Sequence, residues 1–163
     1  MKRNVRLFSV ILALICAISM FPAMRATAAP APHEQIDLPD NMEIRPITPD
    51  MYDRVLRLYD HGMNDYQYMC IRRGTFIGAF IDGDLAGFIG VHGRGAMGFL
   101  LILPQYRRHG LGYILEASLI NRITNQGGTP FAQIVEDNVA SLGLQQKLGM
   151  VRSEGKLTYL FKS

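Results

Sequence analysis

The chain has 163 residues, a formal net charge of +3 and a pI near 9. Residues 1–28 hold four of its 17 basic residues and none of its 14 acidic ones, so the remainder carries a net charge of −1. The basic pI therefore gives no case for nucleic-acid binding. The sequence contains no internal repeat and no metal-ligand cluster, since its histidines are scattered.

The N-terminus has the features of a secretory signal peptide. Three basic residues precede an apolar stretch from Leu7 to Met20, Pro22 ends it, and Ala26-Thr27-Ala28 supplies small residues for cleavage. A single uncleaved anchor is the alternative, because residues 7–24 come near the lower limit for spanning a bilayer. Both interpretations place the rest of the chain outside the cytoplasm, because the basic residues keep the N-terminus on the cytoplasmic side of the membrane. Residues 29–41, with three prolines, are expected to be a linker.

The first part of residues 42–163 predicts one strand, two helices and a hairpin. Residues 42–47 form the strand, and Thr48 with Pro49 then starts a helix. A second, short helix is expected within residues 61–72. Residues 75–81 and 85–91 predict two strands joined at Asp82-Gly83, a strong hairpin signal.

An arginine- and glycine-containing loop follows the next predicted strand. The apolar run 97–103 predicts a buried strand that Pro104 ends. After the loop, apolar residues recur at three- and four-residue spacings from Leu111 to Leu119, as one face of a helix requires. The glycines allow close approach to the backbone, and the free N–H groups of the helix start attract anions. The sequence therefore predicts an anion cradle at Arg107-Arg108-His109-Gly110-Leu111-Gly112, and the alternative is a tight turn with solvated arginines.

The last part predicts a strand, a helix and a strand. Gly127-Gly128-Thr129-Pro130 breaks the chain, and residues 131–135 predict a buried strand. Asn138 is expected to cap a helix that runs to Lys147 and stops at Gly149. Leu157, Tyr159 and Phe161 alternate along a final strand.

Two motifs in this order resemble those of the GNAT superfamily of N-acetyltransferases. Arg107, Gly110 and Gly112 match its Arg/Gln-x-x-Gly-x-Gly/Ala loop, and residues 138–150 are similar to its Asn-x-x-Ala/Ser … Lys-Leu-Gly-Phe helix. The run Leu-Pro-Gln-Tyr-Arg-Arg-His-Gly-Leu-Gly is closest to the glycine N-acyltransferase-like branch. The resemblance implies a single α/β domain with a mixed central sheet flanked by helices.

The same resemblance implies acetyl-CoA as the co-substrate and a direct transfer to an amine in a ternary complex. It places the pyrophosphate at the loop and the pantetheine arm along the preceding strand and the last helix. The expected contacts are Leu101, Ile102, Leu103, Arg107, Arg108, His109, Gly110, Leu111, Gly112, Asn138 and Ser141. One amide of the strand would polarise the thioester carbonyl.

The catalytic acid and base are not defined by a motif. Many members have a tyrosine four residues before the glycine of the last helix, where this chain has Gln145, and an amide is no general acid. Glu136 and His92 are candidate bases, although Glu136 equally suits a place beside the helix start and His92 the end of a hairpin. No residue stands out as a covalent nucleophile except Cys70.

The expected function is acetyl transfer from CoA to a primary amine of a small molecule or peptide. A non-catalytic CoA- or nucleotide-binding module is the alternative, suggested by Gln145 and by the lack of a carboxylate before the loop. Acetyl-CoA is cytoplasmic, whereas the leader indicates export. A true start at Met42, another acyl donor, or a compartment that supplies acetyl-CoA would each resolve this conflict.

Overall fold

The computed structural model describes residue 33 and residues 36–59 and 64–153. The strands are β1 (Met42–Pro46), β2 (Phe76–Ile81), β3 (Asp84–Val91) and β4 (Met97–Ile102). The α-helices are α2 (Tyr52–Leu58), α3 (Asn64–Arg72), α4 (Leu111–Asn125) and α5 (Val139–Lys147), and two 3-10 turns are η1 (Pro49–Met51) and η2 (Pro104–Tyr106). This order confirms the elements predicted from residue 42 to the arginine loop.

The four strands form one sheet in the order β1-β2-β3-β4, and every neighbouring pair is antiparallel. The turn between β2 and β3 is the expected one, since Asp82 and Gly83 have φ angles of 51° and 84°. Two positive φ angles in a two-residue loop match the twist of the paired strands. Asn41 Nδ2 also donates to Asp82 Oδ2 and ties this turn to the start of β1.

Alternation along the strands divides the core between the two faces of the sheet. In β2, Ile77 and Ala79 join one buried cluster, and Phe76 and Phe80 join the other. The first cluster packs against α4, and the second packs against α2 and α3. Because side chains of a strand alternate in direction, these apolar runs predict a sheet covered on both faces.

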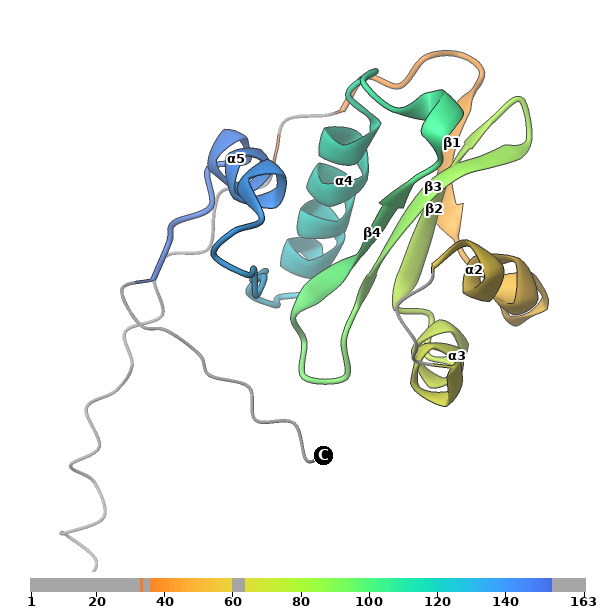
Figure 1. Ribbon diagram of the computed structural model, residues 1–163, viewed down its shortest axis with the longest axis horizontal. Coiled ribbons are helices and arrows are strands. Elements are labelled where there is room, and N and C mark those ends of the chain that lie inside the picture. Colours follow the sequence, from red (N-terminus) through yellow and green to blue (C-terminus); the bar gives the residue numbers. More distant parts are fainter. Residues whose placement is uncertain (1–32, 34–35, 60–63, 154–163) are drawn as a thin grey trace, which may run out of the picture.

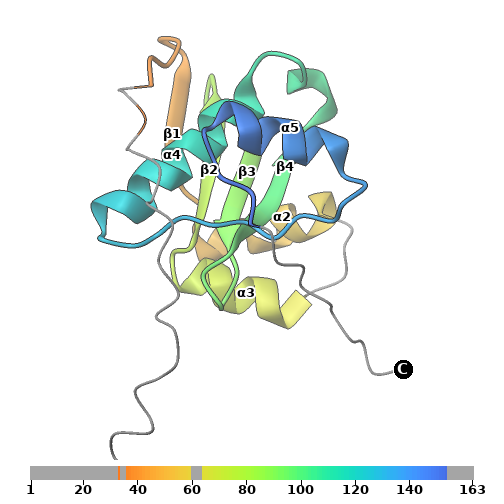
Figure 2. The ribbon, with the colours of Figure 1, turned by 90° about the vertical axis from the view of Figure 1, so that its left-hand side faces the viewer.

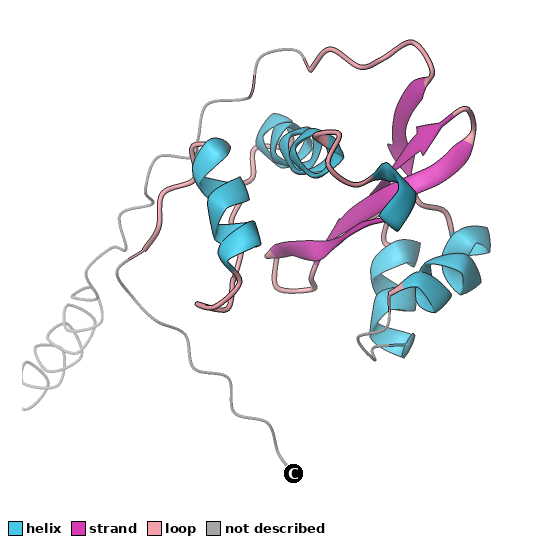
Figure 3. Ribbon diagram, turned by 45° about the horizontal axis from the view of Figure 1, so that its top comes forward, coloured by secondary structure: helices cyan, strands magenta, loops and turns pink. Residues whose placement is uncertain are grey.

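The layers are visible in the ribbon views. Helices α2 and α3 lie on one side of the sheet, and α4 lies across the other (Figures 1 and 3). Helix α5 lies beside α4 on that same face (Figure 2). The result is a single domain of the α/β class, with α4 packed on β2, β3 and β4.

The predicted buried strand at residues 131–135 is wrong. This segment meets β4 at one parallel bridge between Met97 and Ala132, and Phe131 and Val135 are exposed. Its apolar run predicted burial, but nothing in the run fixes a partner, and the chain leaves β4 after the bridge. The outer edge of β4 stays open beyond this point among the described residues. The predicted last strand and residues 1–28 lie outside that part of the chain.

Candidate functional site

A β-bulge shapes the strand that leads to the loop. Gly90 pairs with Gly98 and Phe88 pairs with Leu101, so Ile89 of β3 faces two residues of β4. Phe99 has a φ angle of +58°, which is uncommon for a non-glycine residue. A bulge leaves its extra residue out of the ladder and re-aims the neighbouring groups. The bulge was missed from the sequence, where Gly98 within the strand was the available signal.

The loop after β4 has the form expected of an anion cradle. Gly110 lies before the first residue of α4 with a left-handed φ of 78°, and no side chain caps the helix. The first turn of α4 holds no acidic residue. A Cβ added at Gly110 would meet no atom within 4 Å, and at Gly112 it would make ordinary contact with Leu144 and Leu100. Packing therefore does not explain these glycines; the left-handed φ accounts for Gly110, and the helix start is left accessible to an anion.

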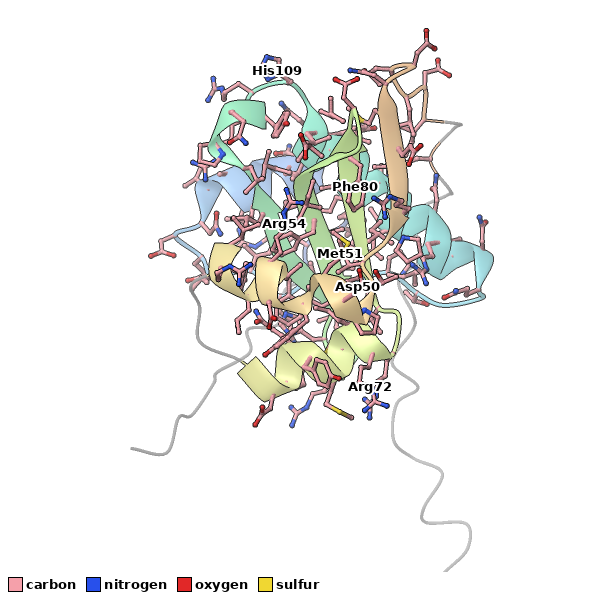
Figure 4. The ribbon with its side chains drawn as sticks, turned by 90° about the vertical axis from the view of Figure 1, so that its right-hand side faces the viewer. Asp50, Met51, Arg54, Arg72, Phe80 and His109 are labelled. Atoms are coloured by element: carbon pink, nitrogen blue, oxygen red, sulfur yellow. The ribbon has the colours of Figure 1, made fainter. Side chains whose placement is uncertain are left out.

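The basic residues of the loop differ in their roles. The Nε of Arg107 donates to the carbonyl oxygen of Ile102 at 2.9 Å, which ties the loop back to β4. Arg108 has a φ of 68° and is exposed, as is His109. Figure 4 shows His109 at the outer end of this loop, at the opposite end of the molecule from Arg72. The loop thus presents Arg108 and His109 to solvent beside the helix start.

The backbone of β4 offers one open edge next to the loop. The N–H of Leu103 donates to Ala86 of β3 at 2.9 Å. Successive residues of a strand point their backbone groups to opposite edges, so the Ile102 groups face the outer edge. Its carbonyl is the one that Arg107 occupies. The backbone groups of Leu101, like those of Leu103, point to β3. Among Leu101, Ile102 and Leu103, therefore, only Ile102 presents its backbone N–H to the outer edge.

Helix α5 begins as predicted. The side chain of Asn138 accepts a hydrogen bond from the N–H of Ser141 at 3.1 Å, and Gly149 ends the helix with a φ of 70°. A Cβ at Gly112 would lie 3.7 Å from Leu144 and 3.9 Å from Leu100, and both leucines pack against the cluster that contains α4 residues, so α5 lies beside the start of α4. The structure therefore brings Asn138 and Ser141 onto the helix that flanks the cradle, although the Asn138 oxygen serves as a cap.

Gln145 is buried and bonded to a residue that the sequence reading missed. Its Nε2 donates to Oε1 of Glu116 on α4, and the two residues are 8% and 6% exposed. Burial raises the pKa of Glu116 to about 7, against the opposing effect of the Gln145 hydrogen bond. The available signal was one carboxylate among the mostly apolar residues from Leu115 to Ile120.

His92 lies at the bulge. Its ring stacks on Phe99 with 4.0 Å between centroids, and the Tyr66 ring lies on it at 6.2 Å. A Cβ at Gly98 would approach His92 Nε2 to 2.4 Å, so the imidazole covers that glycine. Burial lowers the pKa of His92 below its usual 6.5. A neutral imidazole beside an irregular strand can accept a proton.

The other candidates lie elsewhere. Glu136, which precedes α5, is exposed and forms an ion pair at 3.5 Å with Arg152, which follows α5. Cys70 is 2% exposed and belongs to the core on the α2 and α3 side. The structure therefore brings together the loop, the outer edge of β4 and α5. It places His92 at the bulge near the start of β4, and it leaves Glu136 and Cys70 outside that arrangement.

Two general features concern the described residues. They contain no group of three or more histidine, cysteine or acidic residues placed to hold a metal ion. None of their helices has the length and apolar character needed to cross a membrane.

Comparisons with known proteins agree with this geometry. The family model of FR47-like proteins matches residues 78–157, which include β4, the loop, α4 and α5. No curated protein sequence matches the chain. The match to the family spans the cradle and the helix beside it.

Solved structures share the fold. A Drosophila protein has a TM-score of 0.64 at 27% identity over 70% of this chain, and the chain spans 40% of that protein. The aminoglycoside acetyltransferase AAC(6')-Iy, solved with a CoA-containing bisubstrate analogue, has a TM-score of 0.59 at 20% identity, covering 75% of this chain and 99% of its own. A possible acetyltransferase of Clostridium difficile has a TM-score of 0.61 at 12% identity, with 76% and 99% covered.

These features define an acyltransferase-type α/β fold. The chain is similar to FR47-like proteins over residues 78–157 and has the fold of solved N-acetyltransferases. The glycine N-acyltransferase-like branch stays a prediction, since no comparison singles it out.

Proposed function

We propose that the chain is an N-acyltransferase that moves an acetyl group from CoA to a primary amine of a small molecule or peptide. The observation that carries this proposal is the uncapped start of α4, where a Cβ at Gly110 would meet no protein atom within 4 Å and one at Gly112 would make only ordinary contacts. The pyrophosphate would accept hydrogen bonds from the N–H groups that follow Gly110, with Arg108 and His109 contributing charge. Solved relatives of the same fold hold CoA, which supports the same co-substrate here.

The rest of the site would orient the thioester and the amine. The pantetheine arm would run along β4 at Leu101 to Leu103, between that edge and α5 with Asn138 and Ser141. The bulge at Phe99 would direct a strand amide at the thioester carbonyl. These residues position and polarise the thioester without forming a covalent intermediate.

Catalysis would use His92 as the base. A protonated amine is not nucleophilic, so His92 would take up its proton while the nitrogen attacks the carbonyl carbon. The C–S bond then breaks and the thiolate takes a proton from water, because the Gln145 amide has none to give at neutral pH. His92 is the observation that favours an enzyme over a non-catalytic CoA- or nucleotide-binding module.

The N-terminal segment adds a proposal about location. Residues 1–28 would direct the chain out of the cytoplasm or anchor it, and acetyl-CoA would then have to be supplied in that compartment. Sequencing the N-terminus of the protein from its native cells tests this. A chain that begins at residue 29 supports cleavage, and one that begins at Met42 overturns export.

Ligand binding and turnover test the function. Acetyl-CoA and desulfo-CoA should both raise the melting temperature, since a ligand at a hundredfold excess over Kd stabilises by about 2.7 kcal/mol. Free-thiol release from acetyl-CoA should depend on an added amine from a panel. Binding without amine-dependent release would support the non-catalytic alternative, and no shift with either compound at millimolar concentration would overturn CoA binding.

A further inference from the structure

Glu116 and Gln145 form a buried polar contact between α4 and α5. Together with Gln67 they are the buried polar or charged residues of the described chain. Gln145 Nε2 donates to Glu116 Oε1, which accounts for one atom of each side chain. The other two oxygens, Glu116 Oε2 and Gln145 Oε1, are buried and have no hydrogen-bond partner.

Two unpartnered acceptors at one buried contact need a donor. A buried acceptor without a partner loses the hydrogen bonds that water would give it. A proton on Glu116 Oε2 would turn that oxygen into a donor for Gln145 Oε1. A carboxylic acid and a carboxamide each then present one donor and one acceptor, so they can pair through two parallel hydrogen bonds. One proton would therefore satisfy both oxygens.

We propose that Glu116 and Gln145 form a proton-linked clasp, in which a neutral carboxyl and an amide join α4 to α5 by two hydrogen bonds. When Glu116 releases its proton, one of the two bonds is lost and a charge is left between the helices. Gln145 stands at the position where many GNAT proteins have a tyrosine. Gln145 is thus a positioning residue, and so is Glu116.

The charge environment agrees with a neutral Glu116. Burial is the main cause that raises its pKa, and the Gln145 hydrogen bond is the only opposing one. Ionisable side chains on the elements around the pair are Tyr113 and Arg122 on α4, Lys147 on α5, Asp84 on β3, and Glu136 and Asp137 before α5. None of them is a cause of the shift. Arg122 instead donates to the carbonyl of Gly74, at the far end of α4 from the cradle.

The position of the clasp links it to ligand binding. Helix α4 begins at Gly110 and Gly112, and α5 carries Asn138 and Ser141. This step rests on the proposed function: the clasp would keep the two sets of CoA contacts, on α4 and on α5, at a fixed distance from each other. The affinity for acetyl-CoA should then fall as pH rises through the pKa of Glu116.

A titration of the full chain tests the proton directly. The side-chain carboxyl ¹³C resonance of Glu116, assigned by its connectivity in the wild-type protein, is followed from pH 4 to pH 9. A midpoint near 7 supports the clasp. A midpoint near the 4.5 of an ordinary glutamate overturns it, and this measurement does not depend on any variant folding.

Thermal unfolding gives a second readout. A folded-state pKa above the unfolded value means that the native state binds the extra proton, so stability is complete below about pH 4.5 and falls as pH rises to about 7. Glu116→Gln keeps two hydrogen bonds without a titrating group, so its melting temperature should lose this slope. Glu116→Leu should also lose it and melt lower at pH 5. The matched control is Glu43→Gln, an exposed carboxylate paired with Arg45, which should keep the wild-type slope.

The outcomes separate the clasp from the function. An unchanged slope in Glu116→Gln overturns the clasp, whatever the ligand does. The affinity for acetyl-CoA is measured for the wild type and for Glu116→Gln at pH 6 and at pH 8. At each pH the wild-type affinity is divided by that of the variant, so that the effect of ligand ionisation cancels. A several-fold fall in that ratio supports the link to binding, and a constant ratio overturns it. No binding at either pH, with the unfolding slope intact, supports the clasp and overturns the proposed function.

Discussion

The imidazole of His92 stacks on the Phe99 ring at 4.0 Å between centroids, at the residue where β4 bulges. The side chain that covers the irregular strand is therefore one whose pKa is lowered by its burial. A lowered pKa enlarges the neutral fraction of His92 at pH 7. In the proposed site the same bulge would aim a strand amide at the thioester, and it places His92 next to that strand.

The first prediction follows from that pKa. A base must be neutral to act, so kcat/KM should rise with pH through a midpoint below 6.5. His92→Gln should lower kcat by roughly 10²-fold and abolish this acidic limb. At each pH the kcat/KM of the wild type is divided by that of the variant, because the amine acceptor also ionises and its effect cancels in this ratio. A variant that keeps both the rate and the limb would exclude His92 as the base.

Gly98 should be required for the placement of His92. A Cβ there would approach His92 Nε2 to 2.4 Å, so Gly98→Ala must displace the ring. We expect a loss of kcat comparable to that of His92→Gln, with acetyl-CoA still bound. The control is Gly143→Ala on α5, where a Cβ meets no atom within 4 Å. That change should stabilise the helix by about 0.5–1 kcal/mol. Equal activity in both alanine variants would contradict the assignment.

Local sequence signals predicted the parts of the site that neighbouring residues determine. Arg107, Gly110 and Gly112 lie within six residues, between a predicted strand and a predicted helix, and the structure places them at the start of α4; the bound anion stays a prediction. Asp82-Gly83 likewise determines its own turn, and Asn138 its own cap. Each of these features depends on backbone geometry within a few residues, and each was predicted from the sequence.

Features that depend on distant residues were not predicted. Glu116 and Gln145 are 29 residues apart, and their hydrogen bond exists because α5 packs on α4. The sequence indicated only that Gln145 stands where many superfamily members have a tyrosine, and the structure buries it against a carboxyl. The bulge at Phe99 depends on the register of β4 against β3. The hydrophobic pattern of the sequence predicts the helices and strands, but these contacts depend on how the helices and strands pack against one another.

The cradle glycine has its own prediction. Gly110→Val places a branched side chain where the pyrophosphate would meet the helix start, so acetyl-CoA should no longer raise the melting temperature. The φ of 78° also strains any side chain at that position. Gly83→Val controls for this strain, since Gly83 has a φ of 84°, and a Cβ at either glycine meets no atom within 4 Å. Both variants should lose stability, but Gly83→Val should still bind. Binding by Gly110→Val would show that the anion lies elsewhere.

The last prediction separates the two arginines of the loop. Arg107 Nε donates to the Ile102 carbonyl, whereas Arg108 is exposed with no such bond among the described residues. Arg107→Ala should weaken acetyl-CoA binding by about tenfold, the equivalent of about 1.4 kcal/mol, because the loop loses its tie to β4. Arg107→Lys should not restore binding, since an ammonium lacks the planar N–H group that reaches this carbonyl.

Arg108→Ala should weaken binding less and chiefly at low salt, as expected of a screened charge. Calorimetric titrations at two salt concentrations measure these differences, with Arg54→Ala on α2 as the control that leaves binding unchanged (Figure 4). Equal, salt-dependent losses in Arg107→Ala and Arg108→Ala would mean that both arginines act only as charges.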